Sequence, residues 1–272
     1  RRRRREECMS DKAKRIIRKY YEFLVTKFKI LHEQKIFSYE NVKVKYMLKE
    51  DDEADALIIV FSACTRKGLK ARYNYVKTLD GIPANRLYIL DDYAKDHRGS
   101  YYMGENFQFN EEKATDALIK KTIAALKTKK LIFCGSSKGG YAALNFGLQY
   151  CGAYMVIGAP QYYLTSYLKD SENFATLEHI LGKADKQKEE TLEYRLQNKI
   201  YNNEKCSSQH IYVHYSNQEH TYQEHVVHML EDMKKCNYQI TDDVASYTNH
   251  GDLSYYFPDF LRNTIAKIVE SR

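Results

Sequence analysis

Leu131–Gly140 reads LIFCGSSKGG, an apolar run that stops at a G-x-S-x-G turn and continues into small residues typical of a helix. This order of strand, sharp turn and helix is typical of a nucleophile elbow, in which glycines let the strand and the helix pass closely. Ser137 would then stand clear of the sheet, at a helix N-terminus whose dipole favours developing negative charge. A plain glycine-rich connection or a phosphate-binding loop is the alternative interpretation. We interpret Ser137 as a nucleophile.

The composition is that of a globular protein with 272 residues and only three prolines, long enough for one α/β domain with an insertion. No stretch approaches the roughly 20 apolar residues of a membrane span. The basic N-terminus runs into a charged helix rather than into the apolar segment of a signal peptide. A net charge of +7 suits an anionic substrate or a membrane surface. The six cysteines form no C-x-x-C pair, which favours reduced thiols in a cytoplasmic protein.

The N-terminal region is set apart from the main domain. Residues 1–9 begin with five consecutive arginines, and we interpret them as an artificial extension or a leader remnant. Apolar side chains at helical spacing between Ile17 and Leu31 predict an amphipathic helix in the region 10–40. This helix is expected to pack on the sheet or on a neighbouring subunit. A membrane-surface helix is the alternative.

The rest of the chain, residues 41–272, alternates apolar strands with helices, which predicts a mostly parallel sheet between helices. Together with the serine turn this pattern is that of an α/β-hydrolase fold. We expect 42–48 to be an edge strand. Residues 161–209 have helical patches without a convincing strand, which favours a helical cap over the carboxyl edge of the sheet. The other expected strands are 56–61, 86–90, 131–134, 154–158, 211–215 and 238–247, and the expected helices are 73–79, 110–127, 220–235 and 254–271.

A nucleophilic serine needs a histidine base, which in turn needs an acid to hold its tautomer. In α/β-hydrolases the chain order is serine, acid, histidine, and the histidine follows the last strand. His250 stands at that place. Glu219 is the carboxylate in the loop after strand 211–215, and we favour it as the acid. Asp242, Asp243, Asp252 and Glu224 are the competing carboxylates.

The oxyanion hole needs backbone N–H donors close to the serine. We expect one from Lys138, the residue after the nucleophile, and one from Ala63 in the loop after strand 56–61. The Lys138 side chain is either solvated or able to attract an anionic ligand. Arg98 with Tyr101 and Tyr102 forms an unusual loop cluster that is either a surface turn or a substrate contact.

A cluster of histidines could suggest a metal site, but its spacing matches no standard zinc pattern. We therefore expect no metal. The cluster is interpreted as a polar helix face and consists of His220, His225 and His228.

Several motifs occur together in one bacterial group: FSA after strand 56–61, RGSYY in mid-chain, GSSKGG at the turn, AP after strand 154–158 and a late His-Gly-Asp loop. On these motifs the chain resembles α/β-hydrolase-fold capsular polysaccharide biosynthesis proteins, including capsule O-acetyltransferases. More distantly it is similar to the acetyltransferase-like component of accessory Sec systems. The resemblance spans roughly residue 42 to the C-terminus.

The resemblance implies an acetyl group taken from acetyl-CoA as co-substrate, with no bound cofactor, and passed by Ser137 and His250 to a sugar hydroxyl. The family places its acid in the 216–220 loop as aspartate, where this chain has Asn217 and Glu219. The expected partner is an anionic polysaccharide or glycan rather than nucleic acid. A membrane or capsule-assembly contact, at the inner face of the membrane, and oligomer formation remain open. An esterase or deacetylase with the same triad, or a non-catalytic subunit, is the alternative function.

Overall fold

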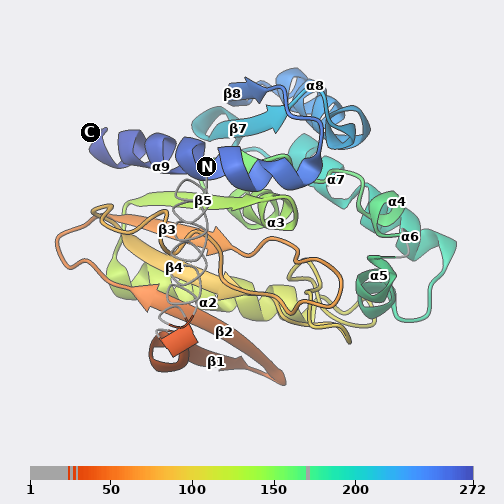
Figure 1. Ribbon diagram of the computed structural model, residues 1–272, viewed down its shortest axis with the longest axis horizontal. Helices are drawn as coiled ribbons and strands as arrows, with labels where there is room; N and C mark the ends of the chain where they lie inside the picture. Colours follow the sequence, from red (N-terminus) through yellow and green to blue (C-terminus); the bar gives the residue numbers. More distant parts are fainter. Residues whose placement is uncertain (1–23, 25–26, 29, 170–171, 272) are drawn as a thin grey trace, which may run out of the picture. The chain divides into compact units, whose positions relative to one another are not determined.

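The computed structural model describes residues 24, 27–28, 30–169 and 172–271, and the described strands form one sheet in the order β1-β2-β4-β3-β5-β6-β7-β8 (Figure 1). The six strands β4, β3, β5, β6, β7 and β8 run parallel to one another, and β2 runs antiparallel to β4. The strand bounds are β1 (Lys35–Tyr39), β2 (Val42–Lys49), β3 (Ala56–Phe61), β4 (Asn85–Leu90), β5 (Lys130–Ser136), β6 (Tyr154–Gly158), β7 (His210–Ser216) and β8 (Gln239–Ala245).

Helices pack on both faces of this sheet. α3 packs on β5, β6 and β3, α2 packs on β2, and α9 packs on β5, β6 and β7. The prediction of a mostly parallel sheet between helices is confirmed. The helix bounds are α2 (Asn110–Leu126), α3 (Lys138–Gly147), α4 (Leu164–Leu168), α5 (Phe174–Leu181), α6 (Lys186–Glu193), α7 (Arg195–Tyr201), α8 (Val227–Lys235) and α9 (Leu253–Glu270), with short turns η1 (Cys206–Ser208), η2 (Tyr222–Val226, a π-helix) and η3 (His250–Asp252).

The chain divides into two units, Arg1–Lys35 and Ile36–Arg272. The predicted remnant, residues 1–9, and the first part of the predicted amphipathic helix lie outside the described residues. In the first unit the helix ends at Glu33. Extending that region to residue 40 was wrong, because residues 35–39 form β1. For the same reason β2 is not the edge strand: β1 lies outside it.

Residues 73–79 do not form the predicted helix. They make a turn, and Tyr75 has a φ of 61°, a left-handed backbone that a helix does not accept. The Tyr75 hydroxyl instead lies 2.5 Å from the Ser136 hydroxyl, just before the serine turn. This loop is therefore held by a side-chain contact that hydrophobic spacing does not reveal.

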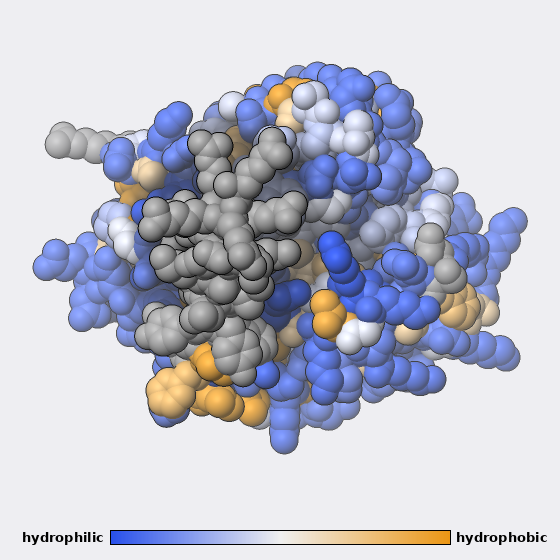
Figure 2. All heavy atoms as spheres, viewed as in Figure 1, coloured by the Kyte–Doolittle hydropathy of each residue, from blue (hydrophilic) through white to orange (hydrophobic). Residues whose placement is uncertain are grey.

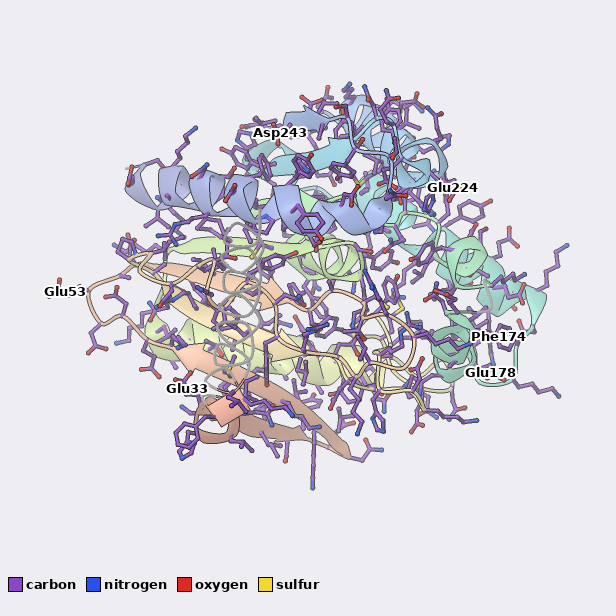
Figure 3. The ribbon with its side chains drawn as sticks, viewed as in Figure 1. Glu33, Glu53, Phe174, Glu178, Glu224 and Asp243 are labelled. Atoms are coloured by element: carbon purple, nitrogen blue, oxygen red, sulfur yellow. The ribbon has the colours of Figure 1, made fainter. Side chains whose placement is uncertain are left out.

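The segment between β6 and β7 contains α4 to α7 and η1, and no strand among its described residues. Figure 3 shows Phe174 and Glu178 of α5 at the opposite end of the sheet from Glu53, which precedes β3. These helices therefore lie toward the carboxyl end of the parallel strands. Backbone hydrogen bonds connect α5 to the loop after β4. The N–H groups of Asn106 and Phe107 donate to the carbonyls of His179 and Ile180 at 3.0 and 2.6 Å.

The outer surface is mostly polar. On the face drawn in Figure 2, hydrophilic side chains cover most of the described surface and hydrophobic ones form small separate groups. No helix among the described residues is long and apolar enough to cross a membrane. The described cysteines are free thiols, namely Cys64, Cys134, Cys151, Cys206 and Cys236.

Strand β5 and helix α3 cross at van der Waals contact because Gly135 faces the backbone of Gly139, and Gly139 in turn faces the end of β3. A Cβ at Gly135 would lie 2.5 Å from the backbone carbonyl carbon of Gly139. A Cβ at Gly139 would lie 2.7 Å from the carbonyl oxygen of Phe61, at the end of β3. Both obstacles are backbone atoms, which cannot turn aside as a flexible side chain can. The start of α3 is thus fixed against two neighbouring strands.

We expect Gly139→Ala to destabilise the fold by about 1–3 kcal/mol, the usual range for overpacking. Alanine is the better helix former by about 1 kcal/mol, so the same change at an open site would not destabilise. Gly251→Ala is the matched control, because an added Cβ there meets nothing within 4 Å. Urea unfolding measures both variants. Equal midpoints for Gly139→Ala and wild type would show that the crossing can relax.

Candidate active site

Ser137 occupies the turn between β5 and α3 with a φ of 51° and a ψ of −117°, a backbone conformation that side-chain-bearing residues rarely adopt. Its N–H donates to the carbonyl of Gly158 on β6 at 2.8 Å, and its own carbonyl accepts from the N–H of Tyr141 at 3.0 Å. The residue is 8% exposed. Residues held in strained backbone by their surroundings cluster at functional sites.

His250 comes from η3, directly after β8 at the carboxyl edge of the sheet. Its Nε2 lies 3.1 Å from the Ser137 Oγ, although the two residues are far apart in sequence. Parallel strands end at one edge, so the β5–α3 turn and the loop after β8 meet there. The ordinal position of His250 in the chain therefore places it beside the serine.

Glu219 follows β7, and its side chain is buried. Its Oε1 lies 3.2 Å from His250 Nδ1, and its Oε2 accepts from the Thr221 N–H at 3.1 Å. Burial alone would raise the pKa of Glu219, but hydrogen bonds and charge attraction from His250, with bonds from Thr221, bring that pKa below its ordinary 4.5. The carboxylate is thus ionised at neutral pH. The Thr221 hydroxyl also approaches His250 Nδ1, at 3.1 Å.

Three of the four competing carboxylates have other partners. Asp242 accepts from the Tyr215 hydroxyl at 3.0 Å, and Asp243 pairs with His214 at 2.6 Å. Both line a groove of about 930 Å³ between the last strands and α9, and neither Ser137 nor His250 is among the lining residues of that groove. Glu224 faces His220 at 3.3 Å. Among the described residues, Glu219 is the carboxylate that is hydrogen-bonded to His250.

The contacts fix where the protons lie. An ionised Glu219 can only accept, so in a neutral His250 the hydrogen is on Nδ1 and the Nε2 lone pair faces Ser137. The serine hydroxyl hydrogen then points at the imidazole. This is the resting arrangement that a serine nucleophile, a histidine base and an orienting acid require.

Gln161, two residues after the Ala159 turn that ends β6, also contacts the serine. Its Nε2 donates to Ser137 Oγ at 2.9 Å, and its Oε1 accepts from the Tyr101 hydroxyl at 3.1 Å. Gln161 is fully buried and Tyr101 is 2% exposed. The sequence marked the preceding Ala-Pro pair but gave no signal for the glutamine itself, because a lone glutamine in a loop belongs to no catalytic pattern.

The two predicted oxyanion donors differ in whether their N–H groups already have hydrogen-bond partners. Lys138 begins α3, so its backbone N–H has no partner within the helix. The Ala63 N–H, in contrast, donates to the Asn74 side-chain oxygen at 2.8 Å. The preceding N–H, of Ser62, donates to the Tyr102 hydroxyl at 2.7 Å. The predicted use of Ala63 is therefore not supported, because an internal acceptor occupies its donor.

Arg98, Tyr101 and Tyr102 were predicted to form either a surface turn or a substrate contact, and the structure places all three side chains in the interior. The Arg98 guanidinium donates to the carbonyls of Thr65 and Glu172, at 2.9 and 2.5 Å, and so ties the loop after β3 to the segment before α5. Tyr102 is fully buried, and its hydroxyl donates to the Ile89 carbonyl at 2.7 Å. Neither side chain is available to a substrate in this arrangement.

The Lys138 side chain is neither solvated nor free to attract an anion. Its Nζ lies 2.9 Å from Asp91 Oδ2, and both side chains are essentially unexposed, at 1% and 0%. It also donates to the Arg98 carbonyl at 3.1 Å. A Cβ at Gly99 would overlap this pair, so the glycine of RGSYY makes room for it. This buried ion pair joins the serine turn to the loop after β4.

The histidines of the predicted polar helix face do not converge. His225 is buried, and its Nδ1 accepts from the Tyr163 N–H at 3.3 Å, while His220 faces Glu224. Burial lowers the pKa of His225 to about 4, so it is neutral at physiological pH. In the part of the chain that the structure describes, no group of three or more histidine, cysteine or acidic side chains is arranged to hold a metal ion.

Neither a family model nor a curated protein sequence matches this chain. Solved structures do match it in fold. The capsule O-acetyltransferase of Neisseria meningitidis serogroup A has a TM-score of 0.71 and 23% identity, over 85% of this chain and 93% of that one. That enzyme has also been solved as a histidine-to-alanine variant in complex with CoA.

Two further structures are similar. A chain of the glycosylation-associated Gap123 complex of Streptococcus agalactiae has a TM-score of 0.70 and 16% identity, over 88% of this chain and 47% of that one. The fluorophosphonate-binding serine hydrolase F of Staphylococcus aureus has a TM-score of 0.62 and 13% identity, over 88% and 98%. The expected resemblance to capsule O-acetyltransferases is thus confirmed at the level of structure, and this chain has an α/β-hydrolase fold.

Proposed function

We propose that this protein is a serine-dependent O-acetyltransferase that moves an acetyl group from acetyl-CoA, through Ser137, to a hydroxyl of a capsular or other surface polysaccharide. The observation that carries this proposal is the hydrogen-bonded row from Glu219 through His250 to Ser137, with distances of 3.2 and 3.1 Å. The likeness in fold to a capsule O-acetyltransferase that has been solved with CoA favours this donor and this class of acceptor.

In the first half-reaction, Ser137 Oγ attacks the thioester carbonyl while its proton passes to His250 Nε2. The carbonyl π electrons move to oxygen, and the α3 N-terminus at Lys138 faces that developing charge with an unpaired N–H. When the tetrahedral intermediate collapses, the carbon–sulfur bond breaks. The CoA thiolate then takes the proton from His250, leaving an acetyl ester on Ser137.

In the second half-reaction, His250 accepts the proton of an incoming sugar hydroxyl, whose oxygen attacks the acetyl ester. Collapse returns the proton to Ser137 and releases the acetylated sugar. Glu219 stabilises the imidazolium in both steps without taking its proton. The helical segment α4 to α7 would act as the cap that limits water at the acyl ester. The net charge of +7 suits an anionic polysaccharide, and a cytoplasmic location would supply acetyl-CoA.

Brief exposure to acetyl-CoA should add one acetyl group to Ser137, detected by mass spectrometry of the intact protein and of its peptides. Ser137→Ala should remain unmodified. His250→Ala should fold normally but acylate about 10²–10⁴-fold more slowly, the usual contribution of a general base. A wild type that releases no thiol and gains no acetyl group would contradict the proposal.

Transfer and hydrolysis are separated by following free thiol and free acetate with and without polysaccharide. We expect acceptor to increase thiol release while acetate stays low. If acetate release exceeds transfer at saturating acceptor, the protein is an esterase with the same residues. A folded wild type that a fluorophosphonate probe does not label would identify a non-catalytic subunit.

Glu219 also makes the stability of the protein depend on pH. Because its pKa is lower in the folded state than the ordinary 4.5, the ionised carboxylate stabilises the fold above about pH 4.5 and this contribution is lost as pH falls through the folded pKa. Glu219→Gln should therefore be less stable than wild type near pH 7. The difference in unfolding free energy should shrink below pH 4.5.

Urea unfolding at pH 7 and at pH 4 measures this difference. Glu178→Gln, on the exposed side of α5, is the control and should show no such pH dependence. A constant difference between wild type and Glu219→Gln across this range would mean that the carboxylate is not held ionised by His250.

A further inference from the structure

A neutral side-chain amide touches the nucleophile of this protein. We propose that the Gln161 amide is the second donor of the oxyanion hole, with Tyr101 as the residue that positions it. This inference rests on the proposed function. It assigns to a side chain the role that backbone N–H groups of the loop after β3 usually have in this fold.

The first two N–H groups of that loop are already engaged. The Ser62 N–H is engaged by the Tyr102 hydroxyl at 2.7 Å, and the Ala63 N–H by Asn74 at 2.8 Å. Using either would first require breaking an internal hydrogen bond. A hole built only on the Lys138 N–H would lack a partner for the second lone pair of the oxyanion. The Gln161 amide already lies at the reacting atom.

The orientation of the Gln161 amide follows from the proton positions. The Ser137 hydroxyl hydrogen points at His250. Any further side chain beside Oγ must therefore donate a hydrogen bond to it. An amide oxygen placed there would meet lone pairs, whereas the NH₂ group donates at 2.9 Å. The Tyr101 hydroxyl donates to the other end of the amide. Burial keeps the Tyr101 pKa well above its ordinary value of 10, so it stays a donor at neutral pH.

Geometry brings the same NH₂ group to the oxyanion. When Ser137 Oγ bonds to the thioester carbon, the carbonyl oxygen becomes attached to the same carbon as Oγ. A nitrogen 2.9 Å from Oγ is therefore near enough for its second hydrogen to reach the oxyanion, which is two bonds away from Oγ. The amide has two hydrogens, so it can serve both oxygens.

Three members of this network stand on left-handed backbone: Ser137 with φ 51°, Tyr101 with φ 56°, and Ala159, two residues before Gln161, with φ 34°. Such conformations are energetically unfavourable and persist where the surroundings impose them. Their coincidence around one amide indicates that the fold holds this contact under strain. A donor held in advance needs no reorganisation when charge develops.

The donor must act mainly in the transition state. In the resting enzyme a neutral N–H on a neutral hydroxyl is an ordinary hydrogen bond, and hydrogen bonds to charged groups are about twice as strong. The contact therefore strengthens as the oxyanion forms. Removing it should lower the rate of acylation and leave the affinity for acetyl-CoA unchanged.

The test compares Gln161→Met, Tyr101→Phe and the double variant. We expect Gln161→Met to slow acetylation of Ser137, and its labelling by a fluorophosphonate, by about 10²–10³-fold. Tyr101→Phe keeps the ring and loses one neutral hydrogen bond, so about tenfold is expected. The double variant should be no slower than Gln161→Met, because Tyr101 acts through the amide.

Gln209→Met is the matched control. Gln209 is also fully buried and also donates from its amide, to the Leu148 and Tyr150 carbonyls at 3.2 and 2.8 Å, far from the serine turn in the fold. It should lower stability without changing the rate of the folded enzyme. An equal loss of rate in Gln209→Met, a wild-type rate in Gln161→Met, or a double variant slowed by the product of the single effects would overturn the proposal.

The two probes separate this inference from the proposed function. A wild type labelled by the fluorophosphonate but not acetylated by acetyl-CoA removes the transferase, and labelling rates of the variants still decide the role of Gln161. A wild type modified by neither probe overturns both.

Discussion

The crossing of β5 and α3 at Gly135 and Gly139 is the constraint on which the site depends. No side chain larger than hydrogen fits there, because backbone atoms of the partner segments lie 2.5 and 2.7 Å from any added Cβ. With the start of the helix pressed onto β3 and β5, Ser137 must reverse the chain in a single residue. The buried Lys138–Asp91 pair, at 2.9 Å, fixes the same turn to the loop after β4. Breaking such a pair from one side usually destabilises a fold by about 3–5 kcal/mol.

The backbone conformation of the residues beside the serine is set by this turn rather than by their own propensities. Tyr101 and Tyr102 follow Gly99 in left-handed backbone, which bulky side chains avoid unless their surroundings require it. The Tyr102 hydroxyl accepts from the Ser62 N–H and donates to the Ile89 carbonyl, so it occupies a backbone donor of the loop that supplies oxyanion-hole N–H groups in α/β-hydrolases. Two features thus occur together: Tyr102 occupies the Ser62 N–H, and the Gln161 amide lies beside Ser137.

The sequence predicted the sheet and the order of the site residues because both follow from chain order. Apolar runs mark strands, and parallel strands must end at one edge, so the turn after β5 and the loops after β7 and β8 had to meet. Glu219 was the carboxylate of its loop, and it is hydrogen-bonded to His250. Gln161 and the buried Lys138 depend on contacts between segments with no shared periodicity. From the sequence, a lysine after a serine turn is expected to be solvated. Only the fold shows that Lys138 pairs with Asp91 and that Gly99 leaves room for this pair.

Exposure divides the site into a sealed side and an open one. Gln161, Tyr101 and Glu219 are essentially buried, whereas the His250 side chain is 24% exposed. In the proposed mechanism, a second substrate would therefore reach the acyl ester past the imidazole, which would also remove its proton. In that mechanism the sealed side would stabilise charge equally well whether a sugar hydroxyl or water attacks. The choice between transfer and hydrolysis would then fall to residues beside the exposed edge of His250, such as His220 and Thr221. Under the proposed function, the residues of acylation and those that select the acceptor would thus belong to different elements, so one set could vary while the other is kept.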